Sequence, residues 1–211
     1  MSAGRGIKKY RRKEENFLGR SAFTLVELLV VTAVLVIFIA VAIPSFRGIS
    51  QSNSLGNAGR DLADTLNLGR DEAMARNRKV NIRLIKSAGV TGGAARYRAM
   101  QVWIAKDDGG EVSALSKVDW LPNGIVISEA TALTPILSST SAQIGTMTVL
   151  GEQCNYVSFV IGANGILDGA VSNAESFLTL VREKDVAAVS PNDFFSVFIN
   201  PATGGVSVYR P

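Results

Sequence analysis

An uninterrupted apolar run near the N-terminus constrains this chain more than any other feature. Residues 25–43 are all apolar except Glu27 and Thr32. At about 1.5 Å per residue, a helix of that length spans roughly 28 Å, close to the hydrocarbon thickness of a bilayer. A helix also satisfies each backbone N–H and C=O within the segment, as lipid requires. The run therefore predicts a membrane-spanning helix, in whose first turns a carboxylate costs a few kcal/mol unless it finds a partner.

The residues before this run give the predicted helix an orientation. Residues 1–22 contain seven Lys or Arg and two Glu. A basic flank beside an apolar segment is retained in the cytoplasm by the positive-inside rule. We therefore expect the N-terminal residues to be cytoplasmic. The bulk of the chain, after Pro44, should lie on the opposite side of the membrane.

The junction between the basic flank and the apolar run resembles a known processing signal. Residues 21–28 read SAFTLVEL, which is similar to the type III signal of type IV pilins and type II secretion pseudopilins. The resemblance implies that a prepilin peptidase cuts between Ala22 and Phe23 and that the new amino group of Phe23 is methylated. Glu27 and Pro44 then occupy the positions they have in the family. Ala22 departs from the family, which usually has Gly there.

The resemblance also implies where the protein acts and which partners it meets. Family members sit in the inner membrane with the leader in the cytoplasm and the C-terminal domain in the periplasm. With an inner-membrane assembly platform, they join other pilin or pseudopilin subunits in a filament. There, Glu27 would pair with the ammonium group of Phe23 on a neighbour and set the axial register, because burying two opposite charges together avoids the cost of burying one alone.

Two plainer interpretations of the apolar run are an ordinary single-pass anchor and an uncleaved signal peptide. A secretory signal peptide normally has a shorter apolar core followed by a small-residue cleavage site. The small-x-small pattern after this core is poor. A plain anchor leaves Glu27 without an explanation, so the pilin-type interpretation is favoured.

The predicted fold is α+β, with a long N-terminal helix packed on a C-terminal antiparallel sheet. Its parts are a leader at 1–22, a transmembrane and filament-core helix at 23–44, an amphipathic continuation at 45–79, and a β-rich domain at 80–211. Apolar residues recur at helical spacing after Pro44, so we expect one long helix of about 24–77. Pro44 should kink it, because proline lacks an N–H and clashes with the carbonyl four residues back.

The second half of this helix carries two further features. Gly56, Gly59 and Gly69 interrupt it and indicate local flexibility or close packing. Residues 69–76, GRDEAMAR, resemble a signature of the FimT/GspH-type minor pseudopilins. For Arg70, Glu72 and Arg76, a solvated face with (i, i+4) pairing is favoured over a specific contact.

The rest of the chain predicts short strands separated by turns rich in Gly and Asn. The strands are expected at 80–84, 97–105, 112–120, 125–127, 157–161, 176–182, 194–199 and 206–209, and the first should be half-buried because its residues alternate. Turns are expected at 107–110, 121–124, 162–165 and 200–205. Residues 128–146 are weakly patterned and predict a long surface loop.

Composition excludes several kinds of site. The chain has no His and a single Cys, Cys154, so histidine catalysis, His/Cys zinc sites and an internal disulfide are impossible. Cys154 is expected to be a small buried hydrophobe, and Trp103 and Trp120 to serve packing. The acidic residues at 107, 108 and 111 lack the spaced ligands of a calcium loop. We expect no cofactor, no metal and no enzymatic activity.

The predicted function is that of a structural subunit, a minor pilin or pseudopilin of a type II secretion pseudopilus or type IV pilus. The alternative is a filament-tip binding module that recognises DNA or an exported substrate. FimT-type minor pilins used in DNA uptake carry G-R-x-R in the final hairpin, whereas residues 204–207 here read GGVS. Beyond residue 22 the acidic residues outnumber the basic ones by one, which argues against nucleic-acid binding.

Overall fold

The computed structural model describes residues 24–89, 93–105, 111–139, 142–169, 176–188 and 190–211, without the side chains of 41–52 and 111–112. The chain divides into two compact units, one ending at Arg47 and the other formed by Gly48–Pro211. Helix α1, Leu25–Arg76, contributes to both. Its bounds confirm the predicted helix of 24–77 within one residue at each end. The predicted leader and the predicted turn at 107–110 lie outside the described residues.

Within the second unit α1 is amphipathic, as its spacing predicts. Its buried side chains recur every three or four residues and include Leu55, Ala58, Leu62, Leu66 and Ala73. The charged side chains of the opposite face are exposed, namely Arg60, Asp61, Asp64, Asp71 and Arg76. One apolar stripe is thus available to pack on a sheet, and the opposite face meets solvent.

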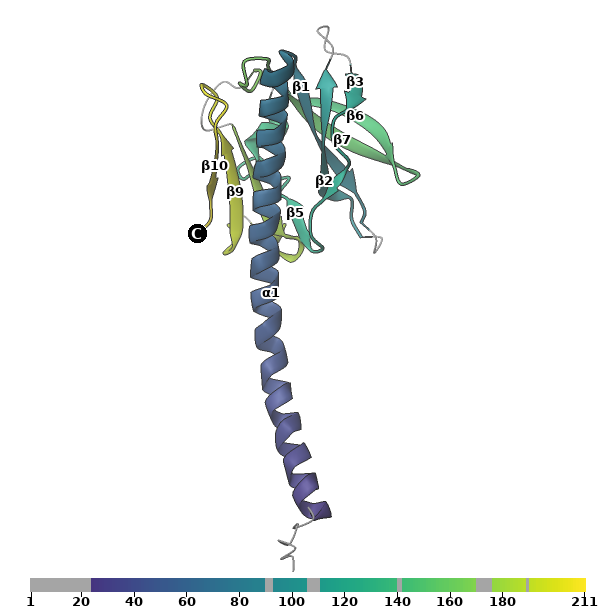
Figure 1. Ribbon diagram of the computed structural model, residues 1–211, viewed down its shortest axis with the longest axis vertical. Coiled ribbons are helices and arrows are strands. Elements are labelled where there is room, and N and C mark those ends of the chain that lie inside the picture. The colour runs from purple at the N-terminus through teal and green to yellow at the C-terminus, as the bar shows by residue number, and fades with distance from the viewer. Residues whose placement is uncertain (1–23, 90–92, 106–110, 140–141, 170–175, 189) are drawn as a thin grey trace, which may run out of the picture. The chain divides into compact units, whose positions relative to one another are not determined.

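The described residues of this unit form one ten-stranded sheet. Eight strands follow the order β10-β9-β8-β5-β2-β1-β7-β6, every neighbouring pair is antiparallel, and β3 and β4 pair with β2 off this path. Figure 1 labels most of these strands. Their bounds are β1 Val80–Ser87, β2 Arg96–Ala105, β3 Glu111–Ala114, β4 Asp119–Trp120, β5 Ile125–Ile127, β6 Gln143–Val149, β7 Glu152–Ile161, β8 Phe177–Arg182, β9 Phe194–Ile199 and β10 Val206–Tyr209.

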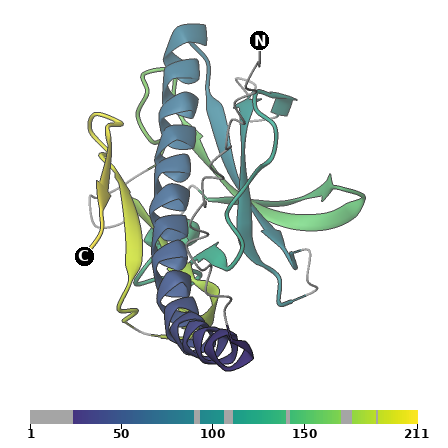
Figure 2. The same cartoon turned by 60° about the horizontal axis from the view of Figure 1, so that its bottom comes forward.

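The main core lies between α1 and one face of the sheet. Figure 2 shows the helix crossing in front of the strands, with β10 on one side and the β6–β7 hairpin on the other. The core joins the α1 stripe to residues such as Ile82, Phe159 and Leu180, all at most 1% exposed. At Gly69 an added Cβ would lie 2.4 Å from Cδ1 of Ile82. This helix glycine therefore serves close packing, one of the two roles that the sequence left open.

The other face of the sheet is also covered, and this corrects the prediction for the first strand. Asn81 and Arg83 of β1 are as buried as their apolar neighbours, so β1 is buried on both faces. A small second cluster of Ile85, Ala99, Val149 and Cys154, joined by Val118, covers part of this face. Cys154 is buried, as predicted, and burial raises the pKa of its thiol.

The predicted long loop at 128–146 is partly wrong. A 3₁₀ turn at Pro135–Ser138 buries Ile136, and β6 begins at Gln143. The sequence QIGTMTV has β-branched residues but no strong apolar alternation, because β6 is an edge strand whose side chains are mostly exposed. Its partner β7 begins five residues earlier than predicted, because residues 152–156 are mostly unburied whereas the predicted part, 157–161, is mostly buried. Most of β6 and the first half of β7 thus lack the burial that makes a strand visible in sequence.

The turns between the strands agree with their residues. Ile125 N–H donates to the carbonyl of Pro122 at 3.1 Å, closing the turn at 121–124. Gly165 N–H donates to the carbonyl of Gly162 at 2.8 Å, although this turn leads only to an isolated bridge between Ile161 and Leu167 and not to a full hairpin strand. The final hairpin has the predicted strands, β9 and β10, at the predicted residues.

Candidate functional site

Helix α1 starts at a side-chain cap within the predicted processing signal. Thr24 precedes the helix, and its Oγ1 accepts a hydrogen bond from the backbone N–H of Glu27 at 3.2 Å. Its carbonyl accepts the first intrahelical bond, from Leu28 N–H at 3.1 Å. Thr24 and Glu27 are the first and fourth residues of a T-x-x-E capping box, in which the acidic side chain can return to the N-cap N–H. Glu27 lies in the first turn, where a carboxylate also interacts favourably with the positive end of the helix dipole.

The apolar segment that follows is exposed on all sides. Every described side chain from residue 25 to 40 is exposed, and the large apolar ones are 45–80% accessible. The only polar side chain after Glu27 in this segment is Thr32, whose hydroxyl donates to the carbonyl of Leu29 at 3.0 Å. A helix that is apolar all round is normally covered, either by protein or by lipid. This surface is therefore the strongest candidate for an interaction site in the first unit.

The structure places the predicted site residues unequally. Glu27 is exposed in the first turn of α1. Pro44 lies within α1, which continues past it to Arg76, and the predicted kink stays a prediction. Ala22 and Phe23 lie outside the described residues, and so does the predicted cut between them. In the part of the chain that the structure describes, no helix is both long enough and apolar enough to cross a membrane.

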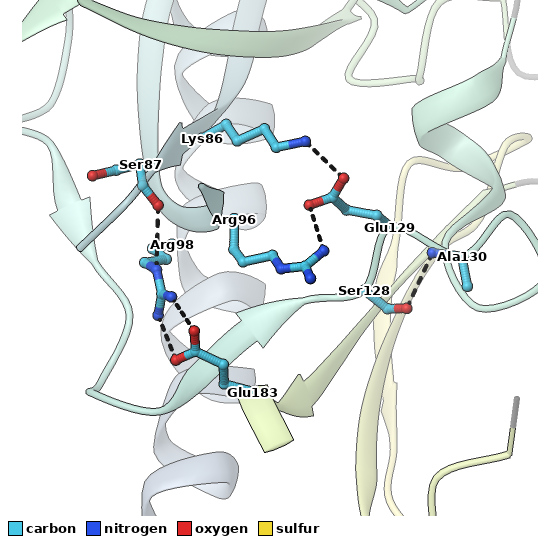
Figure 3. Close-up of polar contacts among 8 residues, drawn as sticks. All are labelled: Lys86, Ser87, Arg96, Arg98, Ser128, Glu129, Ala130 and Glu183. Carbon is cyan, nitrogen blue, oxygen red and sulfur yellow. Dashed lines mark hydrogen bonds and ion pairs between the residues drawn. The ribbon is translucent and has the colours of Figure 1, made fainter. Parts of the chain in front are cut away.

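A cluster of ion pairs joins the loop end of the β1–β2 hairpin to two later segments (Figure 3). The carboxylate of Glu129 accepts from Lys86 Nζ at 2.7 Å and from Arg96 Nη1 at 3.4 Å. The guanidinium of Arg98 donates to both carboxylate oxygens of Glu183, at 3.0 Å for Nη1 to Oε2. These groups pair with one another and leave no catalytic base or nucleophile among them, so the cluster fastens loops to the sheet.

The ion pair with Arg98 also lowers the pKa of Glu183. The hydrogen bond from Arg98 holds the pKa of the Glu183 carboxyl below its usual value, against the opposing effect of desolvation. Arg98 is itself held by the sheet, because its Nε donates to the carbonyl of Ser87 at 3.3 Å. This bidentate geometry is the strongest form of an arginine–carboxylate contact.

An arginine that the sequence did not single out forms a stack on the outer face of the sheet. The guanidinium carbon of Arg83 lies 3.9 Å from the ring centroid of Trp103 and 4.2 Å from that of Tyr156. Its Nη2 donates to the Tyr156 hydroxyl at 3.3 Å. Arg83 is only 2% exposed, so its stack with the two rings packs three strands together. Trp103 thus serves packing, as predicted, while Trp120 is partly exposed at 39%.

The predicted solvated face with (i, i+4) pairing is confirmed for Glu72 and Arg76 but is wrong for Arg70. Arg76 and Glu72 form the expected (i, i+4) ion pair on the exposed face. Arg70 makes a specific contact instead, because its Nη2 donates to the carbonyl of Thr203 in the final hairpin turn at 3.2 Å. No local pattern indicates this contact, because a residue 133 positions away supplies the acceptor. Arg70 thereby connects α1 to the turn between β9 and β10.

No metal-binding chemistry is placed in the described residues. Among them, no group of three or more Cys, Asp or Glu could hold a metal ion. Of the three acidic residues considered as a calcium site, those at 107 and 108 lie outside the described residues. The third, Glu111, is the first residue of β3.

Comparisons with known proteins give similar structures and no sequence relative. No family model matches the chain, and no curated protein matches it. The minor pseudopilin EpsH of the Type 2 Secretion System of Vibrio cholerae is 10% identical with a TM-score of 0.45, over 75% of this chain and 98% of that one. The type IV minor pilin FimU of Pseudomonas aeruginosa is 14% identical with a TM-score of 0.46, over 77% and 96%.

At this level of identity and structural similarity, the two matches transfer no residue role to this chain. The chemistry of its helix and sheet must be argued from its own residues.

Proposed function

We propose that this chain is a minor pilin or pseudopilin, a structural subunit that is cut by a prepilin peptidase and assembled into a pseudopilus or type IV pilus. The observation that carries the proposal is the exposed apolar segment at 25–40, which begins within the SAFTLVEL signal. Before assembly lipid would cover this segment, and after assembly the helices of neighbouring subunits would cover it. Inner-membrane insertion, with the leader cytoplasmic and the C-terminal domain periplasmic, belongs to the same proposal.

Burial of the segment gives Glu27 its role. Transfer of a lone carboxylate into an apolar environment is costly, and removing one partner of a buried ion pair costs several kcal/mol. Cleavage before Phe23 would create an ammonium group just ahead of the Thr24 cap. In a filament that charge and the Glu27 carboxylate of a neighbour would satisfy each other, and the pairing would fix the axial register of the two subunits.

The first experiment determines where the mature chain begins. The full chain is expressed with and without a prepilin peptidase, extracted from membranes, and analysed by intact mass and N-terminal sequencing. We expect a methylated Phe23 at the N-terminus only when the peptidase is present. A chain that starts at Met1 or Ser2 in both samples would make the protein a plain anchor and remove the proposed function.

A second experiment separates the charge of Glu27 from its role in the helix cap. Gln at the fourth position of a capping box can still bond to the N-cap N–H, but it carries no charge. We therefore expect Glu27→Gln and Glu27→Ala to be processed normally and to be nearly absent from sheared, pelleted filaments. Glu27→Asp, which keeps the charge, should retain part of the assembly. If Glu27→Gln assembles like the natural chain, the proposed ion pair does not exist.

A further inference from the structure

The sheet ends in two edge strands, and one of them lacks the usual protection against pairing. Along the eight-strand path, β6 and β10 each have one strand neighbour in the described chain. Natural edge strands are commonly blunted by charged residues, proline or a bulge. β6 reads QIGTMTV, without a charge or a proline, and all seven residues pair with β7 without a register shift. Its free side therefore offers an uninterrupted row of backbone groups.

Both edges present an exposed apolar side chain on the face that carries α1. Ile144 of β6 is paired with Val157, which is paired with Leu84 of the main core. Val208 of β10 is paired with Val197 of the same core. Directly paired residues lie on the same face of a sheet, so both are on the α1 side. Yet Ile144 is 82% and Val208 54% exposed, because α1 covers only the middle of the sheet.

The tip of the β6–β7 hairpin gives a second, independent observation. Leu150 and Gly151 form its two-residue turn, with φ values of 51° and 85°. Such a turn favours Asn-Gly, and a bulky residue at positive φ is uncommon. Leu150 nevertheless occupies the first position with its side chain 88% exposed. An apolar side chain held at an unfavourable backbone angle, and left uncovered by the described residues, indicates a contact outside the chain.

The strand directions decide which partner fits. Seven antiparallel steps separate β10 from β6, so the two edges run in opposite directions. If two copies have the same orientation, β10 of one can pair antiparallel with β6 of the next, and α1 stays on the same face in both. An antiparallel β6–β6 pair that continues the sheet would reverse α1 in one copy. A parallel β6–β6 pair would put the two helices on opposite faces.

We propose that β6 of one copy pairs antiparallel with β10 of the next copy of this chain, so that the sheets continue from subunit to subunit. Leu150 and Ile144 then contact the neighbour's final hairpin. This inference rests on the proposed function, because copies anchored by the same end of α1 point the same way. The interface is heterologous, and such contacts build open filaments when the rotation between copies does not close a ring.

Engineered thiols in the full chain test the pairing directly. In a Cys154→Ala background, Thr146→Cys and Val208→Cys are introduced singly and together, and assembled filaments are treated with a short thiol-to-thiol crosslinker. The double variant should give a ladder of dimers, trimers and larger products, because each copy then offers one thiol to each neighbour. Each single variant should stay monomeric. As a control, Asn123→Cys, in an exposed turn away from both edges, replaces Val208→Cys and should give no ladder.

Dimers from the single Thr146→Cys variant would show a β6–β6 contact, and the absence of products from the double variant would show that the edges do not meet. Either result overturns the proposed pairing. Filament pelleting and the N-terminal residue are measured in the same samples. If pelleting and the Phe23 start persist without a ladder, only this inference falls. If both are absent, the proposed function falls and takes the inference with it.

A charge on the edge provides a test that needs no crosslinker. Thr146→Lys places a cation on the edge strand β6, and natural edge strands use lysine to prevent pairing. We expect at least a tenfold loss of pelleted protein with an unchanged melting temperature, because Thr146 is exposed in the isolated subunit. Asn123→Lys is the matched control and should pellet normally. Normal pelleting of Thr146→Lys would overturn the pairing.

Discussion

Gly59 of α1 lies flat against the ring of Phe195 in β9. A Cβ added at Gly59 would be 2.2 Å from Cδ1 of that ring and within 2.4 Å of two further ring atoms. Phe195 is itself buried in the main core, so a shift of its ring would disturb the packing of its core neighbours. The distance between helix and sheet in this region is therefore set by the absence of a side chain at residue 59.

The first prediction follows from that contact. Gly59→Ala should destabilise the protein, because overpacking a core costs typically 1–3 kcal/mol, of which improved helix propensity offsets at most about 1 kcal/mol. Gly56→Ala is the matched control, since its added Cβ would meet only the end of the Arg210 side chain, at 3.1 Å. It should be neutral or stabilising. Thermal unfolding of the full chain in detergent compares the two, and equal melting temperatures would contradict the close packing at Gly59.

The second prediction concerns Leu150 and separates stability from assembly. Leu150→Asn should raise the free energy of unfolding by roughly 1 kcal/mol, because Asn tolerates the positive φ of this turn better than Leu does. If the hairpin tip contacts a neighbouring copy, the same variant should reduce filament pelleting. Leu150→Ala keeps the backbone cost but removes the contact, so it should reduce pelleting without the gain in stability. Unfolding curves and filament pelleting are measured on both variants. Normal pelleting of both would contradict a contact made by the Leu150 side chain.

The strands and turns of the final hairpin could be predicted from sequence because each is a local property. Phe194–Ile199 and Val206–Tyr209 are short β-branched or aromatic runs around a turn rich in Gly and Asn. The amphipathic half of α1 is equally local, since its buried residues recur at helical spacing. In both cases the local pattern indicates the element that the structure has, and its bounds.

The remaining features depend on residues far apart in the chain. β6 carries little burial, so its residues lack the alternation that marks a strand. Arg83 appears polar and exposed in an alternating strand, but the rings of Trp103 and Tyr156 enclose it. For the candidate site, the apolar run and Glu27 are visible in the sequence. The Thr24 cap is a local contact that the T-x-x-E spacing could have indicated. The unprotected edge of β6 required the order of the strands in the sheet.

The third prediction uses the titration of Glu183. Its pKa is lowered by the hydrogen bond from Arg98, so the pair stabilises the fold fully above the unfolded value of about 4.5. As the pH falls through the lower folded pKa, that stabilisation is lost. Glu183→Gln should therefore have a lower melting temperature than the natural chain at neutral pH. The difference between the two melting temperatures should become smaller as the pH falls below 4.5. A difference that is constant with pH would remove the ion pair as its cause.

The fourth prediction has the opposite sign and concerns Asp61. Although its side chain is exposed, partial desolvation at the helix surface raises the pKa of the Asp61 carboxyl, and the nearby carboxylates of Asp119 and Asp64 add to the shift. A carboxyl whose folded pKa is raised destabilises the fold while it is ionised, and the penalty disappears once the pH falls below its unfolded pKa. Asp61→Asn should thus raise the melting temperature at pH 7, with the gain shrinking toward acidic pH. A loss of stability at pH 7 would contradict this interpretation.

The fifth prediction concerns the connection between α1 and the final hairpin. Arg70→Ala removes the hydrogen bond to the carbonyl of Thr203, which should cost about 1 kcal/mol and speed amide hydrogen exchange in the turn at 200–205. Arg76→Ala is the matched control on the same helix. It breaks an exposed (i, i+4) ion pair that should contribute only about 0.3–0.5 kcal/mol.

The hydrogen-exchange readout locates the effect of each variant. In Arg70→Ala the faster exchange should be confined to the turn and to the adjoining ends of β9 and β10, because the rest of the sheet keeps its ladder. The turn has its own internal bonds, including Gly204 N–H to the carbonyl of Asn200 at 2.7 Å, so it should loosen without melting. Arg76→Ala should leave exchange at 200–205 unchanged. Equal exchange in both variants would mean that the turn holds its conformation without α1.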